Sequence, residues 1–428
     1  MSPKSDPAVD VTAASLGARV ARNSAWLFIG RLGSQAMLVL FTLILARRLG
    51  DEGLGVYAFI TSVIFLGNLT STFGTDMLIM REVAAKREGG LLASAVLIQL
   101  AIAIPFILIV LVAAPYLANQ SAQALSALRL YSFSLLPLAF YTVCSSALRG
   151  IERMDSFAGL NLANGLLLAG LGWVFIQPGS SIVALFAWLL TLQVAMAGLA
   201  LALCARHFPR SSRAWRLSPP DLGQHVRLSA PIAALGFLGA LSQRAGIFLL
   251  AGMLGAAATG WFAAALRPVE ASKIIHFALL GALFPAMSQA HLGAGPDNHS
   301  FARFFASSLT GLLVLSAAFA LVFAFGADAL IPLLFGPGFT PAIDLLKVLA
   351  WLLVPITVTH YLSLMLLSLR RERPILVGLA ASLLLFLALA TWLVPVLGAL
   401  GVAWAMLAAE ILQALILGFA WWRPNAFS

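Results

Sequence analysis

The stretch at residues 156–205 reads SFAGLNLANGLLLAGLGWVFIQPGSSIVALFAWLLTLQVAMAGLALALCA and contains no charged side chain. A bilayer core about 30 Å thick is crossed by roughly 20 helical residues, so an apolar run of this length predicts two membrane-spanning helices. The break between them falls at Gln177-Pro178-Gly179, because proline and glycine disfavour continuation of a helix. We therefore expect a helical hairpin in lipid.

The composition of the whole chain supports the same conclusion. Of its 428 residues, 61% are hydrophobic and only 10% are charged, and the mean hydropathy is +0.98. Since about a quarter of the residues in a soluble domain are charged, this composition excludes a soluble globule. Residues 1–18 have no apolar centre, so we expect no cleavable signal peptide there. The two cysteines lie in apolar segments and predict neither a disulfide framework nor a metal cluster.

Apolar segments of membrane-spanning length recur along the chain. We predict twelve transmembrane helices, near residues 22–46, 54–79, 91–113, 123–148, 156–176, 181–205, 226–253, 258–285, 302–325, 342–369, 375–394 and 398–422. The predicted fold class is an all-α membrane protein with two pseudo-symmetric six-helix lobes around a central cavity. The lobes are residues 1–205 and 226–428, joined by a basic cytoplasmic linker at 206–225. The longest outer loop is expected at about 326–341.

The distribution of Lys and Arg predicts the orientation. With the N-terminus in the cytoplasm, the inner segments hold 18 of the 26 cations, whereas the outer loops hold only Arg47 and Arg48. Such an excess is typical of the cytoplasmic side, so we expect both termini to be cytoplasmic. The same asymmetry accounts for the net charge of +10 without a nucleic-acid partner.

An internal repeat relates the two predicted lobes. Residues 45–58 align without gaps on residues 250–263, which pairs the first helix with the seventh. A weaker match aligns 124–137 with 342–355 and pairs the fourth helix with the tenth. Because each half has an even number of spans, both lobes have the same orientation, as in transporters built from parallel repeats.

Several motifs at turns and helix ends resemble a known family. They are LARRLGDEGLGVY at 45–57, FGTD at 73–76 with REVA at 81–84, FPAMS at 284–288 and LLFGPGFTPA at 333–342. Together they resemble the polysaccharide-exporter branch of the multidrug/oligosaccharidyl-lipid/polysaccharide exporter superfamily. The resemblance implies two lobes that rock around a cavity, and a substrate made of sugars on an undecaprenyl-diphosphate carrier.

Six cations lie inside predicted helices, where each costs about 2.5–3.5 kcal/mol if it faces lipid. Arg129 and Lys347 are close enough to helix ends to reach the interface. The other four are Arg31, Arg244, Arg267 and Lys273, and Gln35 shares a helical face with Arg31. We predict that these five residues bind an anionic headgroup in the cavity. The spacing of Arg267, Glu270, Lys273 and His276 also fits an internal salt-bridge ladder, and this alternative stays open.

No phosphate-binding loop or other nucleotide motif is present, so we expect no ATP hydrolysis. Coupling to H⁺ or Na⁺ is the alternative, with Glu270 or Asp76 as the carboxylate; an ion pair of Asp76 with Arg81 is the competing interpretation. Glu410 is assigned near a helix end. The sequence shows no catalytic or metal-ligand motif, and we expect neither an enzyme nor a cofactor.

Together these features predict a flippase of the bacterial cytoplasmic membrane. It would move a polyprenyl-diphosphate-linked oligosaccharide to the outer leaflet by alternating access, for cell-surface polysaccharide synthesis, with membrane lipid as its surroundings and as a monomer. Two alternatives remain: a cation-coupled multidrug antiporter of the same superfamily, and a membrane sugar polymerase or scaffold.

Overall fold

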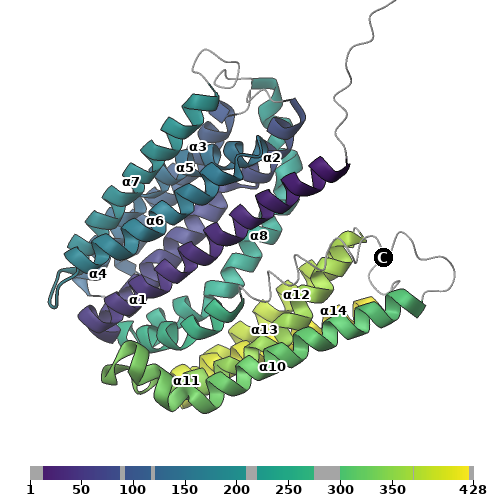
Figure 1. The fold of residues 1–428 in the computed structure, drawn as a ribbon. Coiled ribbons are helices and arrows are strands. Elements are labelled where there is room, and N and C mark those ends of the chain that lie inside the picture. The colour runs from purple at the N-terminus through teal and green to yellow at the C-terminus, as the bar shows by residue number, and fades with distance from the viewer. Residues whose placement is uncertain are drawn as a thin grey trace, which may run out of the picture.

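The computed structural model describes residues 13–86, 92–116, 121–208, 219–273, 299–369 and 371–423, and these residues form helices and short connections without a β-strand. Figure 1 shows two groups of helices that lie together at one end and diverge toward the other. The first group contains α1 (Ala13–Thr72), α2 (Thr75–Lys86), α3 (Leu92–Ala113), α4 (Ala122–Ser132), α5 (Leu135–Gly150), α6 (Met154–Phe175) and α7 (Ile182–His207).

The second group follows in the same order along the chain. It contains a helix described over residues 256–273, α10 (His299–Phe335), α11 (Ala342–Leu349), α12 (Leu353–Ser368), α13 (Arg373–Leu397) and α14 (Ala399–Trp422). α8 (Pro219–Met253) precedes these helices in the chain and runs beside α1 toward the end where the groups meet (Figure 1). Short 3-10 turns lie at Ala114–Tyr116, Pro337–Phe339 and Ala350–Leu352. The all-α fold of membrane-spanning helices in two lobes is thus as predicted.

The predicted spans all have helical counterparts. Among the described residues, nine helices are long and apolar enough to cross a membrane, and the bent pair α4–α5 adds a tenth crossing. The apolar part of α1 is 51 residues long, or about 76 Å at 1.5 Å per residue, which is more than two bilayer cores. It therefore contains two spans. The helix at 256–273 corresponds to the remaining prediction, whose residues 274–285 lie outside the described part of the chain.

A glycine separates the two spans of α1. Gly50 has φ 73° and ψ −169°, a backbone conformation that only glycine adopts readily. Figure 1 shows α2 at the same end of the lobe as the start of α1, so the chain reverses at Gly50. The aligned residue of the second half, Gly255, has φ 86° and separates α8 from the following helix. The repeat is therefore visible in the backbone.

The two halves meet at a reciprocal glycine contact near these turns. A Cβ atom on Gly55 would collide with the carbonyl oxygen of Ala256, and one on Gly260 would collide with the carbonyl oxygen of Asp51. In the repeat alignment Gly55 corresponds to Gly260 and Asp51 to Ala256. Each half thus presents the same positions to the other, as in a two-fold interface. We call this end of the molecule the glycine end.

The second repeat match marks a break that we did not predict. The expected continuous helix at 123–148 is divided into α4 and α5, which meet at 42°. The expected helix at 342–369 contains α11 and α12. Pro137 and Pro355 lie two residues after the start of α5 and α12, where a proline cannot donate a backbone hydrogen bond to the preceding turn. The prediction of one continuous helix was wrong at 123–148. At 342–369 the single span is confirmed over Ala342–Leu367, because the 3-10 turn between α11 and α12 does not interrupt it.

Three further boundaries differ from the predictions. The outer loop expected at 326–341 is mostly helical, because α10 continues to Phe335. The helix expected at 54–79 is broken at Phe73 and Gly74, both with positive φ. α7 continues to His207 and α8 begins at Pro219, so both ends of the predicted linker 206–225 are helical, and residues 209–218 lie outside the described residues. The division into lobes at this linker stays a prediction.

Aromatic side chains fill the core near the glycine end. Phe41 and Tyr57 pack edge to face with ring centroids 5.5 Å apart, and Tyr57 stacks on Phe186 at 6.1 Å. Buried residues of both halves belong to this cluster. Because lipid tails are as apolar as these side chains, close packing rather than water exclusion stabilises the cluster.

Candidate functional site

Two arginines share one carboxylate at the junction of the two halves. Nη1 of Arg267 donates a hydrogen bond to Oε2 of Glu270 at 3.0 Å, and Nη1 of Arg244 lies 4.0 Å from Oε1 of the same side chain. Their side chains are mostly buried, with 14% of Arg267 and 23% of Arg244 exposed. The group carries one excess positive charge, and we call these three residues the arginine cluster.

The arginine cluster faces the first half of the chain. The guanidinium of Arg244 lies over the ring of Phe65 in α1, 5.0 Å from its centroid. Tyr57, also in α1, lies close enough to Arg267 and Arg244 for electrostatic interaction. Nε of Arg244 is buried without a hydrogen-bond partner. A buried donor that lacks a partner is costly, so this position favours an incoming acceptor.

Arg31 lies at a different depth from Arg244. Arg244 precedes the end of α8 by nine residues, which is about 14 Å along the helix. Arg31 precedes Gly50 by nineteen residues, which is about 28 Å. Both helix ends belong to the glycine end, so Arg31 is farther from it than Arg244. The side chain of Arg31 is exposed, and Gln35 lies one turn nearer the glycine end.

A second basic group surrounds Arg149, which sequence analysis counted among the loop cations. Nη2 of Arg149 donates to Oγ of Ser146 at 3.1 Å, and its guanidinium lies 5.0 Å from the ring centroid of Phe157. Arg31 and Asp76 both act electrostatically on Arg149, so these residues lie near one another. Nε of Arg149 is buried without a hydrogen-bond partner. The sequence contained a signal for this residue, because Arg149 is a positive charge in the last turn of an otherwise apolar helix.

Lys273 does not extend a ladder from Glu270. Among the described residues it forms no ion pair within 4.0 Å, and its ammonium lines a cavity in the second half instead. The cavity also contains Glu410, which acts electrostatically on Lys273. Glu410 is the twelfth of the 24 residues of α14, so its assignment near a helix end was wrong. The ladder interpretation holds for Arg267 and Glu270 but not for Lys273.

The remaining charged residues singled out in the sequence are Asp76, Arg129 and Lys347. Arg81 pairs with Glu82 at 3.6 Å, whereas Asp76 lies in the first turn of α2 near Arg149, so the Asp76–Arg81 pair is not formed. Lys347 pairs with Asp328 at 3.0 Å at an exposed position, and Arg129 is exposed in α4. Both agree with the interfacial interpretation. His276 lies outside the described residues.

Polar contacts close the glycine end across the two halves. Nε1 of Trp261 donates to Oδ2 of Asp51 at 2.8 Å. Arg47, also in the first half, donates from Nε to the carbonyl oxygen of Leu334 at 3.0 Å and from Nη2 to that of Leu333, near the end of α10. With the reciprocal glycines, these bonds hold the halves together at one end, while Figure 1 shows the helices diverging at the other.

Chemically, the arginine cluster is suited to bind an anion. Arginine presents a planar fork of donors that matches two phosphate oxygens, and here two such forks share a single carboxylate. No group of three or more His, Cys, Asp or Glu able to hold a metal ion occurs among the described residues.

Comparison with known proteins gives a family and a fold. The model of the family described as "polysaccharide biosynthesis protein" matches residues 20–291, more than half of the chain. No curated protein matches the sequence. Among solved structures, an inward-facing multidrug resistance MATE family transporter of the MOP superfamily has a TM-score of 0.76 at 16% identity, covering 92% of this chain and 94% of that chain.

Two other solved structures have the same fold. An outward-facing MATE family transporter of the MOP superfamily has a TM-score of 0.66 at 16% identity, covering 99% of this chain and 98% of that one. A MOP superfamily transporter from Pyrococcus furiosus has a TM-score of 0.65 at 17% identity over 99% and 98% of the chains. Its description states that reversed polarity of the binding pocket suggests a different function.

Proposed function

The chain belongs to the polysaccharide biosynthesis protein family, and from that premise we propose that it is a flippase for a polyprenyl-diphosphate-linked oligosaccharide. The observation that carries this proposal is the arginine cluster, in which two mostly buried guanidinium groups share one carboxylate. A diphosphate would supply the acceptor oxygens that Nε of Arg244 lacks. Lys273 and, from the other half, Arg31 with Gln35 extend the cationic region along the substrate path.

The closure of one end supports a direction of loading. If both termini are cytoplasmic, as the Lys and Arg distribution indicates, the glycine end lies on the outer side of a bacterial cytoplasmic membrane. In that orientation the closed end faces outward and the diverging ends of the helix groups face the cytoplasm. The TM-score is also higher for the inward-facing relative than for the outward-facing one, 0.76 against 0.66. The headgroup binds from the cytoplasm, the polyprenyl tail stays in lipid, and rocking of the halves then exposes the headgroup outside.

Glu270 links substrate binding to a cation. In the structure its carboxylate is shared by Arg267 and Arg244. A diphosphate competes for the same guanidinium groups, because its oxygens carry more charge than one carboxylate. Glu270, once displaced, takes up a proton or a Na⁺ ion, which a gradient across the membrane supplies. Asp76 near Arg149 is the second candidate for this coupling.

Transport in proteoliposomes tests the proposal. A radiolabelled undecaprenyl-diphosphate-linked sugar is placed in the bilayer, and its exposure to an external glycosidase is followed over time. We expect Arg244→Ala and Arg31→Ala to lose at least about tenfold in rate, since each removes a charge-assisted contact to phosphate. Arg129→Ala removes an exposed cation at a helix end and should retain the full rate. Full translocation by Arg244→Ala and Arg31→Ala would refute the anion site.

A multidrug antiporter is the second candidate, because two of the similar structures are multidrug resistance transporters. An organic cation is attracted by carboxylates and aromatic faces. The arginine cluster instead has excess positive charge next to Phe65, which disfavours such a substrate. Efflux of ethidium by the same proteoliposomes, reduced by Glu270→Gln, would support the antiporter over the flippase.

A further inference from the structure

The second half of the molecule contains a polar cavity that lies outside the arginine cluster and shares only Lys273 with the proposed cationic path. Its volume is about 280 Å³, and its walls come from α8, the helix at 256–273, α12, α13 and α14. α12, α13 and α14 each contribute four residues at intervals of three, one and three, which is one face of a helix. These faces are Ile356, Thr359, His360 and Ser363; Leu379, Ser382, Leu383 and Phe386; and Met406, Ala409, Glu410 and Gln413.

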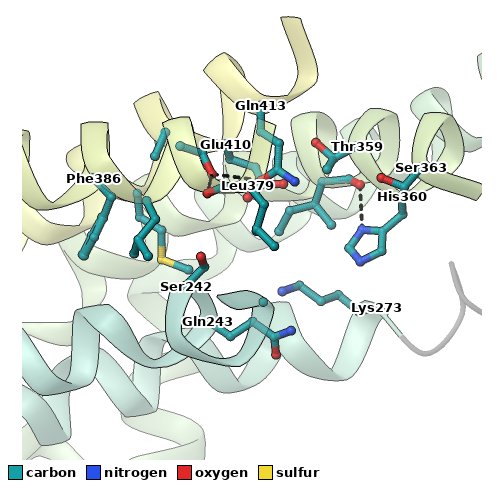
Figure 2. Close-up of a pocket in the computed structure, with 16 residues that line it drawn as sticks. Ser242, Gln243, Lys273, Thr359, His360, Ser363, Leu379, Phe386, Glu410 and Gln413 are labelled. Atoms are coloured by element: carbon teal, nitrogen blue, oxygen red, sulfur yellow. Dashed lines mark hydrogen bonds between the residues drawn. The ribbon is translucent and has the colours of Figure 1, made fainter. Parts of the chain in front are cut away.

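Polar groups of both signs face one another across this cavity. Figure 2 shows Lys273 and Ser242 on one side, with Glu410, Thr359 and His360 on the other. Among the described residues, Lys273 and Glu410 interact electrostatically across this space but form no ion pair within 4.0 Å, and Glu410 also interacts with Thr359.

Some of the lining groups are already engaged. Oγ of Ser382 donates to Oε1 of Gln413 at 3.2 Å, and Oγ of Ser242 donates to the carbonyl oxygen of Leu238 at 3.0 Å. Gln243 is exposed and lines the cavity without a hydrogen bond among the described residues. The cavity therefore offers an ammonium donor, a carboxylate acceptor and an amide with both functions.

The charges decide which class of ligand fits. The ammonium of Lys273 repels a free cation, and the carboxylate of Glu410 repels a simple anion, so a neutral ligand is favoured. A lipid tail is excluded because it would leave both charges without partners. Hydroxyl groups donate and accept, which matches this mixed set. With a volume of about 280 Å³, the cavity has room for one sugar ring.

We propose that this cavity binds one neutral sugar ring of the lipid-linked glycan. Glu410 accepts hydrogen bonds from ring hydroxyls, Lys273 and Gln243 donate to ring oxygens, and Phe386 offers an apolar face at one end of the cavity. The proposal rests on the proposed function, because the cavity adjoins the arginine cluster. Gln243 precedes Arg244, and Lys273 follows Glu270 by one helical turn. A diphosphate on the arginine cluster thus places its first sugar beside the cavity.

Binding of matched probes to the full-length protein in nanodiscs tests this proposal. The reference probe is geranyl diphosphate, which has no sugar. Three further probes carry glucosyl, galactosyl or N-acetylglucosaminyl on the same diphosphate. We expect at least one sugar probe to bind about tenfold more tightly than the reference, because a site built for hydroxyl groups discriminates against a ligand that lacks them.

Substitutions in the cavity test whether the difference in affinity between the sugar probes and geranyl diphosphate arises there. Glu410→Gln and Gln243→Ala should reduce the sugar advantage below about threefold and leave binding of geranyl diphosphate unchanged, whereas Arg244→Ala should weaken all probes. Leu415→Ala, at an exposed position of α14, is the matched control. Because Gln243 is exposed, Gln243→Ala provides the result if Glu410→Gln does not fold.

The outcomes separate the two proposals. If all three sugar probes bind with the affinity of geranyl diphosphate, or if Glu410→Gln and Gln243→Ala both retain the full sugar advantage, the sugar site is refuted while the flippase stands. If no probe binds, the diphosphate site fails, and the sugar site fails with it.

Discussion

Trp261→Phe should open the glycine end. The substitution keeps an aromatic ring but removes the indole N–H that donates to Asp51 at 2.8 Å. A hydrogen bond to a charged group contributes about 1.5–3 kcal/mol, and we take the lower value because both side chains are only partly buried. A loss of about 1.4 kcal/mol changes an equilibrium tenfold. If one molecule in a hundred is open at this end, about one in ten should be open in the variant.

Distances between spin labels measure this population. Ala122→Cys at the start of α4 and Gly338→Cys in the turn after α10 place labels on the two halves, both at exposed positions. The native thiols of Cys144 and Cys204 are fully buried, so they should not be labelled. We expect a long-distance component that grows about tenfold in Trp261→Phe.

Two controls make the result specific. Asp51→Asn keeps an acceptor for the indole but removes its charge, so the increase should be smaller. Trp404→Phe alters an indole that is 49% exposed on α14 and should change nothing. If Trp261→Phe leaves the distance distribution as it is in the unmodified protein, the Asp51–Trp261 bond does not hold this end closed.

Three further changes test other parts of the structure. Gly260→Ala should destabilise the closed form by about 1–3 kcal/mol through overpacking, seen as a lower thermal midpoint, whereas Gly252→Ala has nothing within 4 Å of the new Cβ and should keep the midpoint. Glu270→Gln leaves two mostly buried arginines without their carboxylate; we expect a lower midpoint that pyrophosphate restores, and a variant insensitive to pyrophosphate would contradict the anion site. Lys347→Ala removes an exposed ion pair worth about 0–1 kcal/mol, so transport should stay within twofold, and a large loss would show that Lys347 contacts substrate.

The spans could be predicted from the sequence because a bilayer sets a minimum length for every transmembrane helix. The repeat could be found by aligning the two halves. The break between α4 and α5 was not predicted, since Pro137 is compatible with either a kinked or a divided helix. Pro355, at the matching position, lies inside a single uninterrupted span. Packing against neighbouring helices selects between these forms.

The candidate site was predicted only in part. Arg244, Arg267 and Glu270 meet as their positions suggested, but Arg31 belongs with Arg149. The repeat already indicated this: if its alignment is extended without a gap toward the N-terminus, Arg31 corresponds to residue 236, eight residues before Arg244, which is about 12 Å along a helix. Lys273 lines a cavity together with Glu410, which lies far along the chain, and spacing within one helix cannot reveal such a neighbour.

The reciprocal glycine contact is what two identical chains would form around a two-fold axis, so the two halves meet with the geometry of a symmetric dimer interface. The halves are unlike in the side chains that they place there. Arg47 and Asp51 occupy positions that are Gly252 and Ala256 in the second half, while Trp261 and the carbonyl groups that they bind come from the second half. Each half thus contributes groups that the other lacks at the matching position, so neither half paired with a second copy of itself could form the same set of bonds.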